Sequence, residues 1–187
     1  MARPDQITRE NLAPLVRARG PVSATELAAL LRVNRTTITR TLPDLGDELV
    51  TLGATRSTRY LLRRVVRNIG NRWPLYRLDT DGRASEWAEL EALHDRWWRI
   101  NWAGTTPEWA GLFMAESGLW NGFPFFLSDA RPQGFLGRAI ASRISRTLQL
   151  PEDPRSWSDD DVLVYQLAAG EDLPGNLVVG DDCLRRA

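Results

Sequence analysis

Opposite charges divide this chain into two parts, and that division constrains its fold more than any single motif. Residues 1–72 hold 13 arginines against 6 acidic residues, whereas residues 73–187 hold 11 arginines against 18. All eight tryptophans fall in the second part. Such asymmetry indicates two domains with different partners, nucleic acid for a basic part and protein for an acidic, aromatic one. We therefore predict domains at 1–70 and 73–187.

Composition narrows the class of protein further. The length of 187 residues fits one or two small domains, and 43% hydrophobic residues suffice for ordinary cores. The single cysteine, Cys183, cannot form an internal disulfide, which suits a reducing cytoplasm. Charged residues interrupt the region after Met1, and no apolar run approaches the ~18 residues that suggest a membrane span. The sequence predicts a soluble cytoplasmic protein.

The basic part contains the pattern of two short helices joined by a tight turn. Ser23 and Glu26 match a capping box, which marks the start of the first of them. Asn34 can cap the next helix, predicted over residues 34–45, with Pro43 distorting its last turn. Its outward face is rich in hydroxyl and guanidinium groups: Arg35, Thr36, Thr37, Thr39 and Arg40. A face of this kind is typical of a recognition helix in the major groove.

A hairpin pattern follows over residues 49–62. Two strand-like runs flank a tip over 53–59 that is rich in glycine, serine, threonine and arginine. The tip carries side chains suited to phosphate or minor-groove contact: Arg56, Ser57 and Arg59. A helical pair followed by a basic hairpin predicts a winged helix-turn-helix that binds DNA. Two alternatives stay open: a solvated basic face on a small helical domain, and a winged helix that binds protein.

The acidic part has the pattern of an α+β module. It predicts a strand pair around the Asp-Gly turn at 79–83, a helical run from about 86, a helix over 138–148 and a last strand at 177–179. Ser158, followed by three aspartates, predicts the start of a helix that runs to Ala169 and stops at Gly170.

Four motifs of the acidic part together resemble a known family. A phenylalanine-rich run spans residues 123–138, and the others are Tyr76–Asp79, Asp160–Leu163 and Gly170–Asn176. Together they resemble the N-terminal subdomain of HipA-family serine/threonine kinases, in the YjjJ-like branch where a DNA-binding domain precedes it. In that family the subdomain packs on the kinase N-lobe, and in some systems it is a separate antitoxin. The resemblance implies a kinase partner.

Three residues are the predicted contacts with that partner: Trp120, Phe123 and Arg131. Trp120 lies between two glycines, so an exposed aromatic anchor and a buried one are both open. Metal or catalytic chemistry is not expected elsewhere. His94 is the only histidine and lacks a second ligand cluster, the aspartates at 159–161 suit a helix cap, and Cys183 is incidental. No cofactor is predicted.

Catalysis by the chain itself is not expected. All 24 basic residues are arginine, whereas kinases and P-loop enzymes place a lysine against the ATP phosphates. Neither a G-x-G-x-x-G run nor an H-R-D run is present, and the chain stops where the family's kinase core would begin. The chain is therefore predicted not to be an enzyme.

These patterns lead to one functional prediction and two alternatives. The prediction is an antitoxin and transcriptional autoregulator that binds operator DNA and neutralises a HipA-like kinase, with a homodimer as one form that it can take. One alternative is the N-terminal regulatory part of a longer YjjJ-like kinase. The other is a stand-alone transcription factor whose acidic domain senses a ligand.

Overall fold

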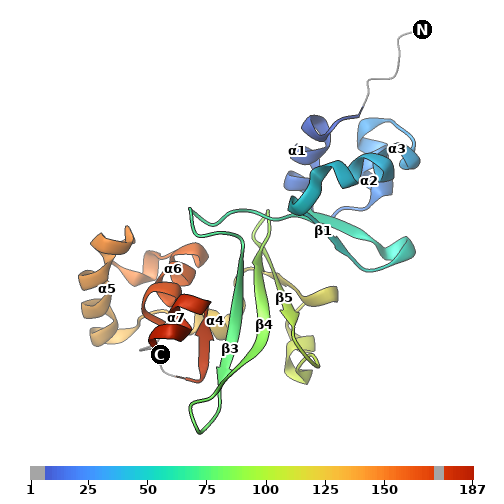
Figure 1. The fold of residues 1–187 in the computed structure, drawn as a ribbon. Helices are drawn as coiled ribbons and strands as arrows, with labels where there is room; N and C mark the ends of the chain where they lie inside the picture. Colours follow the sequence, from blue (N-terminus) through green and yellow to red (C-terminus); the bar gives the residue numbers. More distant parts are fainter. Residues whose placement is uncertain (1–6, 171–174) are drawn as a thin grey trace. The chain divides into compact units, whose positions relative to one another are not determined.

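A computed structural model shows a mixed α+β protein and describes residues 7–170 and 175–187 (Figure 1). The chain divides into two compact units. The first contains residues 1–64 together with 92–97, and the second contains residues 65–91 together with 98–187. Within the described ranges, no helix has the length and apolar character that crossing a bilayer requires.

The described residues of the first unit form three α-helices and a two-stranded antiparallel hairpin. Its elements are α1 (Arg9–Arg19), α2 (Ala24–Leu31), α3 (Arg35–Thr41), β1 (Leu49–Leu52) and β2 (Arg59–Leu62), with Leu49 opposite Leu62. Buried aliphatic side chains from all three helices and from β2 form one core, which includes Leu12, Val16, Leu27, Ile38 and Leu62.

Local hydrogen bonds explain where these helices begin and end. The amide of Ser23 donates to the Glu26 carboxylate (2.7 Å), and the amide of Glu26 donates to the Ser23 hydroxyl (3.2 Å), so the predicted capping box is confirmed. The Asn34 side chain accepts from the amide of Thr36. The α-helix that follows ends at Thr41, and a 3₁₀ stretch (Leu42–Glu48) continues it because Pro43 lacks an amide donor.

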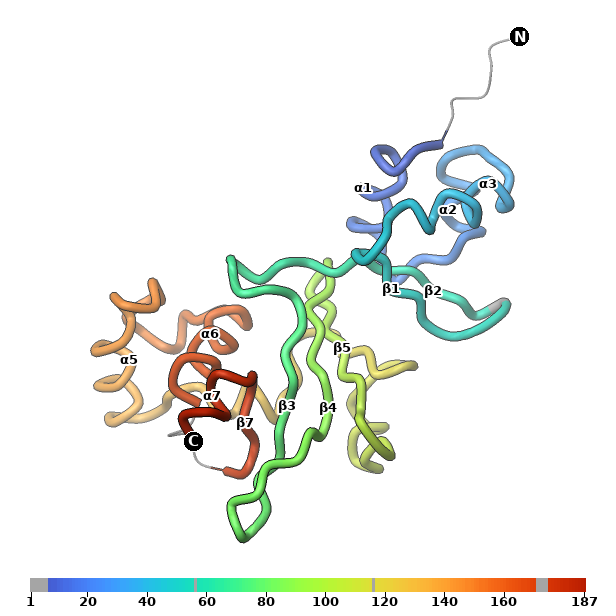
Figure 2. The backbone as a smooth tube through the Cα atoms, viewed as in Figure 1, coloured from blue at the N-terminus to red at the C-terminus, as the bar shows by residue number. Residues whose placement is uncertain are grey.

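The second unit is built on a five-stranded sheet in the order β6-β5-β4-β3-β7. The strands are β3 (Arg72–Leu78), β4 (Ala84–Ala92), β5 (Trp97–Trp102), β6 (Leu119–Asn121) and β7 (Leu177–Val179). Strand β3 is antiparallel to both β4 and β7, and Figure 2 shows β3 and β7 side by side. Four helices gather near this edge: α4 (Phe125–Ser128), α5 (Gly134–Leu148), α6 (Asp159–Ala169) and α7 (Asp181–Arg186).

The helical run predicted from residue 86 is wrong, because these residues form β4 and β5. Ala88, Leu90 and Ala92 are fully buried at alternate positions of β4, which is the period of a strand. Asp95 and Arg96 both adopt positive φ values (58° and 65°) and turn the chain between the strands. Aspartate tolerates a positive φ better than most residues, but arginine does not, so the sequence Asp95-Arg96 gives only a weak turn signal.

Candidate functional site

The outward face of α3 is exposed and carries two arginines. Arg35, Thr36, Thr39 and Arg40 are exposed, Thr37 is half-buried, and Ile38 is fully buried on the opposite side of the helix. The side chains of Arg35 and Arg40 form no ion pair with any residue that the structure describes. Both guanidinium groups are therefore available to an external anion.

The tip of the β1–β2 hairpin supplies a second exposed polar group. Ser57 is exposed, and its hydroxyl donates to the carbonyl of Ala54 (2.9 Å). Arg59 is exposed at the start of β2. The side chain of Arg56 lies outside the described part of the structure, so its predicted DNA contact remains a prediction.

Other arginines of the first unit are held by internal partners. Arg9 and Arg17 both lie within ion-pairing distance of Glu48, at 2.5 Å and 3.8 Å. Arg63 donates to the carbonyl of Asp47. The α3 face is therefore a better candidate for a phosphate contact than the surfaces that carry these paired arginines. The charges of Arg35 and Arg40 are not compensated by an acidic side chain of the described residues.

The two aromatic residues predicted as partner anchors lie in the core of the second unit. Trp120 is 4% exposed and Phe123 is 9% exposed. The ring of Phe123 meets that of Trp98 edge to face at 4.8 Å, and its amide donates to the carboxylate of Asp159. Both side chains therefore have a packing role, and the partner contact stays a prediction. The third residue, Arg131, is half-buried.

Exposed aromatic side chains occur nearby, and sequence reasoning did not select them. Phe113 is 59% exposed and Phe125 is 42% exposed, with their ring centroids 4.8 Å apart. Trp109 packs against Phe125 at 5.7 Å. The phenylalanine-rich run was visible in the sequence, but the sequence could not tell that Phe125 faces outward while Phe123 faces inward.

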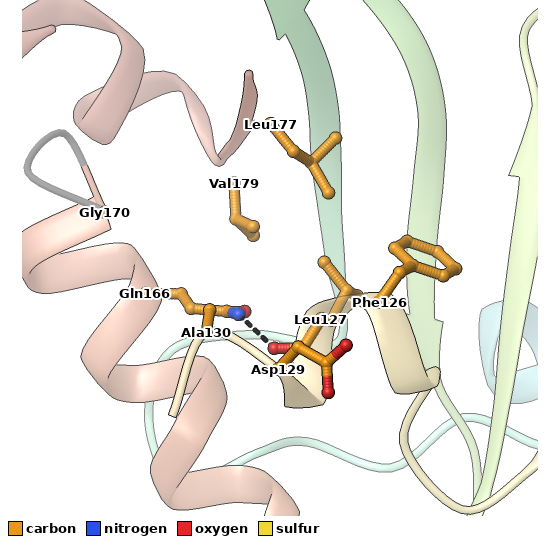
Figure 3. A pocket seen from close by; sticks show the side chains of 8 residues that line it. All are labelled: Phe126, Leu127, Asp129, Ala130, Gln166, Gly170, Leu177 and Val179. Carbon is orange, nitrogen blue, oxygen red and sulfur yellow. Dashed lines mark hydrogen bonds between the residues drawn. The ribbon is translucent and has the colours of Figure 1, made fainter. Parts of the chain in front are cut away.

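One pocket of the second unit, with a volume near 280 Å³, lies among α4, α6 and β7 (Figure 3). Its walls are mostly apolar: Phe126, Leu127, Ala130, Leu177 and Val179. Gln166 is 2% exposed, and its amide nitrogen donates to the carbonyl of Leu127, as Figure 3 shows. Its amide oxygen is buried and has no partner among the described residues. The pocket wall therefore contains one unsatisfied acceptor.

The motif predicted over 170–176 borders this pocket through Gly170, but residues 171–174 lie outside the described part of the structure. A second cavity, near 400 Å³, is lined by Arg131, Arg138 and Arg155 at the start of α5. Arg131 and Arg138 both belong to the phenylalanine-rich run over residues 123–138, but nothing in the sequence places Arg155 beside them.

Polar residues weighed as metal or catalytic candidates have local structural roles. No group of three or more histidine, cysteine or acidic side chains suited to a metal ion occurs within the described residues. Asp161 completes a capping box with Ser158 at the start of α6, which confirms the predicted cap. Cys183 is fully buried in α7.

His94 should make the stability of the first unit depend on pH. Burial lowers the pKa of His94 below its ordinary value of 6.5, and the charges of Arg17 and Arg64 lower it further. The unfolded chain then binds more protons than the folded one, so stability should fall as the pH drops below about 6.5. Chemical denaturation at several pH values would measure this, with His94→Gln as the variant. An unchanged pH profile in that variant would assign the dependence to other groups.

Comparison with known proteins places the chain in a family. Residues 69–187 match the family described as "YjjJ-like toxin, middle domain". The chain is 33% identical over 171 residues to the protein named Toxin YjjJ of Escherichia coli (strain K12), covering 90% of this chain. The chain therefore belongs to the YjjJ-like toxin family. This chain spans 35% of the length of that relative. No solved structure matches this chain.

These comparisons correct the principal functional prediction. Both the matched family and the relative are described as toxins, so the predicted role of antitoxin and kinase inhibitor is wrong. That prediction took the likeness to a kinase subdomain as the sign of a separate neutralising partner. The alternative, a regulatory portion of a longer YjjJ-like protein, agrees better with the comparisons.

Proposed function

We propose that this chain is the DNA-binding regulatory portion of a YjjJ-like toxin. In this proposal the first unit is a winged helix-turn-helix, with α3 as the recognition helix and the β1–β2 hairpin as the wing. The observation that carries it is the pair of exposed arginines on α3, Arg35 and Arg40, which form no ion pair within the described part of the chain. Free guanidinium groups on an exposed helix face are the chemistry that reads phosphates and guanine edges.

The second unit, in the same proposal, is a HipA-like subdomain that supports a toxin's kinase core and does not catalyse by itself. The likeness of its motifs to HipA-family kinases and the match to the YjjJ-like middle domain support this role. The chain contains no lysine to hold ATP phosphates. We place its action in the cytoplasm, where operator DNA is accessible.

Binding of the full chain to duplex DNA tests the proposal. With about six phosphate contacts, the affinity should fall by about three decades between low and moderate salt. The double variant Arg35→Ala/Arg40→Ala should bind at least about tenfold more weakly and show a shallower salt dependence. Fluorescence anisotropy with the DNA upstream of the gene, and with a scrambled duplex, measures both quantities.

A charge-matched variant controls for net charge. Arg143 and Arg146 are exposed on α5 of the second unit, so Arg143→Ala/Arg146→Ala removes the same charge elsewhere. This variant should bind DNA as the unaltered chain does. Equal weakening by both double variants, or binding that does not depend on salt, would refute α3 as the recognition helix.

A further inference from the structure

A cavity of the second unit concentrates positive charge within an otherwise acidic region. Its volume is near 400 Å³, which lies within the range of ligand sites, and its walls include Arg131, Arg138 and Arg155. Residues 73–187 as a whole hold 11 arginines against 18 acidic residues. Three guanidinium groups around one hollow are therefore a local reversal of the surrounding charge.

Two of the three arginines have no ionic partner among the residues that the structure describes. The guanidinium of Arg155 is held by both carboxylate oxygens of Asp153, at 3.0 Å and 2.7 Å. Arg131 and Arg138 form no ion pair with any residue of the described ranges. Hydrogen bonds from Arg155 and, to a smaller extent, the charge of Arg138 lower the pKa of Asp153 to about 2, so Arg138 acts on the same small region.

The backbone at the start of α5 adds hydrogen-bond donors to this cavity. The helix spans 15 residues, and Gln133, which precedes it, provides no side-chain cap. No acidic residue occupies its first turn. The N–H groups of the first turn have no acceptor within the helix, so they can donate to a ligand, and the helix dipole favours an anion in front of them.

Close packing places the backbone next to Arg131 and Arg138 against this helix start. A side-chain carbon added at Gly137 would lie 2.6 Å from the carbonyl carbon of Pro132, so the first turn of α5 rests directly on that backbone. Arg131 precedes Pro132, and Arg138 follows Gly137. The contact that requires glycine thus holds the backbones of Arg131 and Arg138 near one another, and both side chains line the same cavity.

We propose that this cavity binds a phosphoryl group, as free phosphate or as a small phosphate monoester. Arginine presents paired donors that match phosphate oxygens, and the exposed first-turn amides provide further donors. This function is separate from DNA binding by the first unit and does not depend on it. It would give a YjjJ-like protein a response to a phosphorylated metabolite.

Calorimetric titration of the full chain tests this site with three probes: inorganic phosphate, O-phosphoserine and AMP. At least one probe should bind saturably, and Arg131→Ala and Arg138→Ala should each weaken that binding by at least about tenfold. Tighter binding of an ester than of phosphate would identify the ligand as an ester, and the reverse order would identify free phosphate. Both orders support a phosphoryl site.

Arg143→Ala is the matched control, because Arg143 is exposed on the same helix but does not line the cavity. It should leave binding unchanged. Arg138 is also exposed, so its replacement should not impair folding, which circular dichroism can verify. The proposal is overturned if no probe binds saturably or if the control weakens binding equally. It is also overturned if duplex DNA, rather than a small phosphate, binds in a manner that depends on Arg138.

Discussion

Replacing Gly118 by alanine should destabilise the second unit by about 3 kcal/mol or more. Gly118 adopts φ +78°, a conformation that costs any side chain free energy. An added side-chain carbon would also lie 2.3 Å from the carbonyl oxygen of Ile100. Because that oxygen belongs to β5, an interior strand between β6 and β4, it cannot move away without disturbing the pairing of these strands.

Urea denaturation followed by tryptophan fluorescence would measure this loss. Seven of the eight tryptophans belong to the second unit, so the signal reports mainly on that unit. Two further variants separate the causes. Gly122 has φ +90° but open space around it, so Gly122→Ala should cost about 1 kcal/mol from backbone strain alone.

Gly111 has neither a left-handed φ nor a neighbour within 4 Å, so Gly111→Ala should be near neutral. The expected order of destabilisation is therefore Gly118, then Gly122, then Gly111. If Gly118→Ala cost no more than Gly122→Ala, the close approach to Ile100 would add nothing to the cost of the substitution.

Features held by local hydrogen bonds could be predicted from the sequence. The capping box at Ser23 and the tight turn at Asp79 both depend on groups within four residues of each other. The helix start at Ser158 belongs to the same class. Short polar side chains have few other ways to satisfy neighbouring amides, so the residue types alone indicate the structure.

Features decided by tertiary packing could not be predicted. The tryptophans of β4 and β5 suggested one face of a helix, whereas burial at alternate positions shows a strand. Trp120 and Phe125 are both aromatic, yet Trp120 on β6 is buried and Phe125 at the start of α4 is exposed, a difference that depends on what packs around each ring. The arginine cavity joins residues 131–138 to Pro154 and Arg155, which no local pattern connects.

The ion pair between Arg67 and Asp161 should be the second most sensitive point of the second unit. The side chain of Asp161 is 8% exposed, and Arg67 donates to its carboxylate. The same carboxylate accepts from the amide and hydroxyl of Ser158, both at 2.8 Å. Arg67 also donates to the carbonyls of Leu148 and Gln149, both at 3.2 Å, at the end of α5. One side chain therefore connects the end of α5 to the start of α6.

Arg67→Ala should lower the stability of this unit by about 3 kcal/mol, because it leaves a buried carboxylate without its counter-ion. Arg83→Ala is the matched control: Arg83 pairs with Asp81 at 3.5 Å, but both side chains are largely exposed, so its loss should cost under about 1 kcal/mol. Denaturant unfolding of these variants, of Asp161→Ala and of the Arg67→Ala/Asp161→Ala double variant completes a thermodynamic cycle. If the pair acts as a unit, the double variant should lose clearly less than the two single losses added together. Strict additivity would mean that Arg67 stabilises the unit through the two carbonyls and not through the carboxylate.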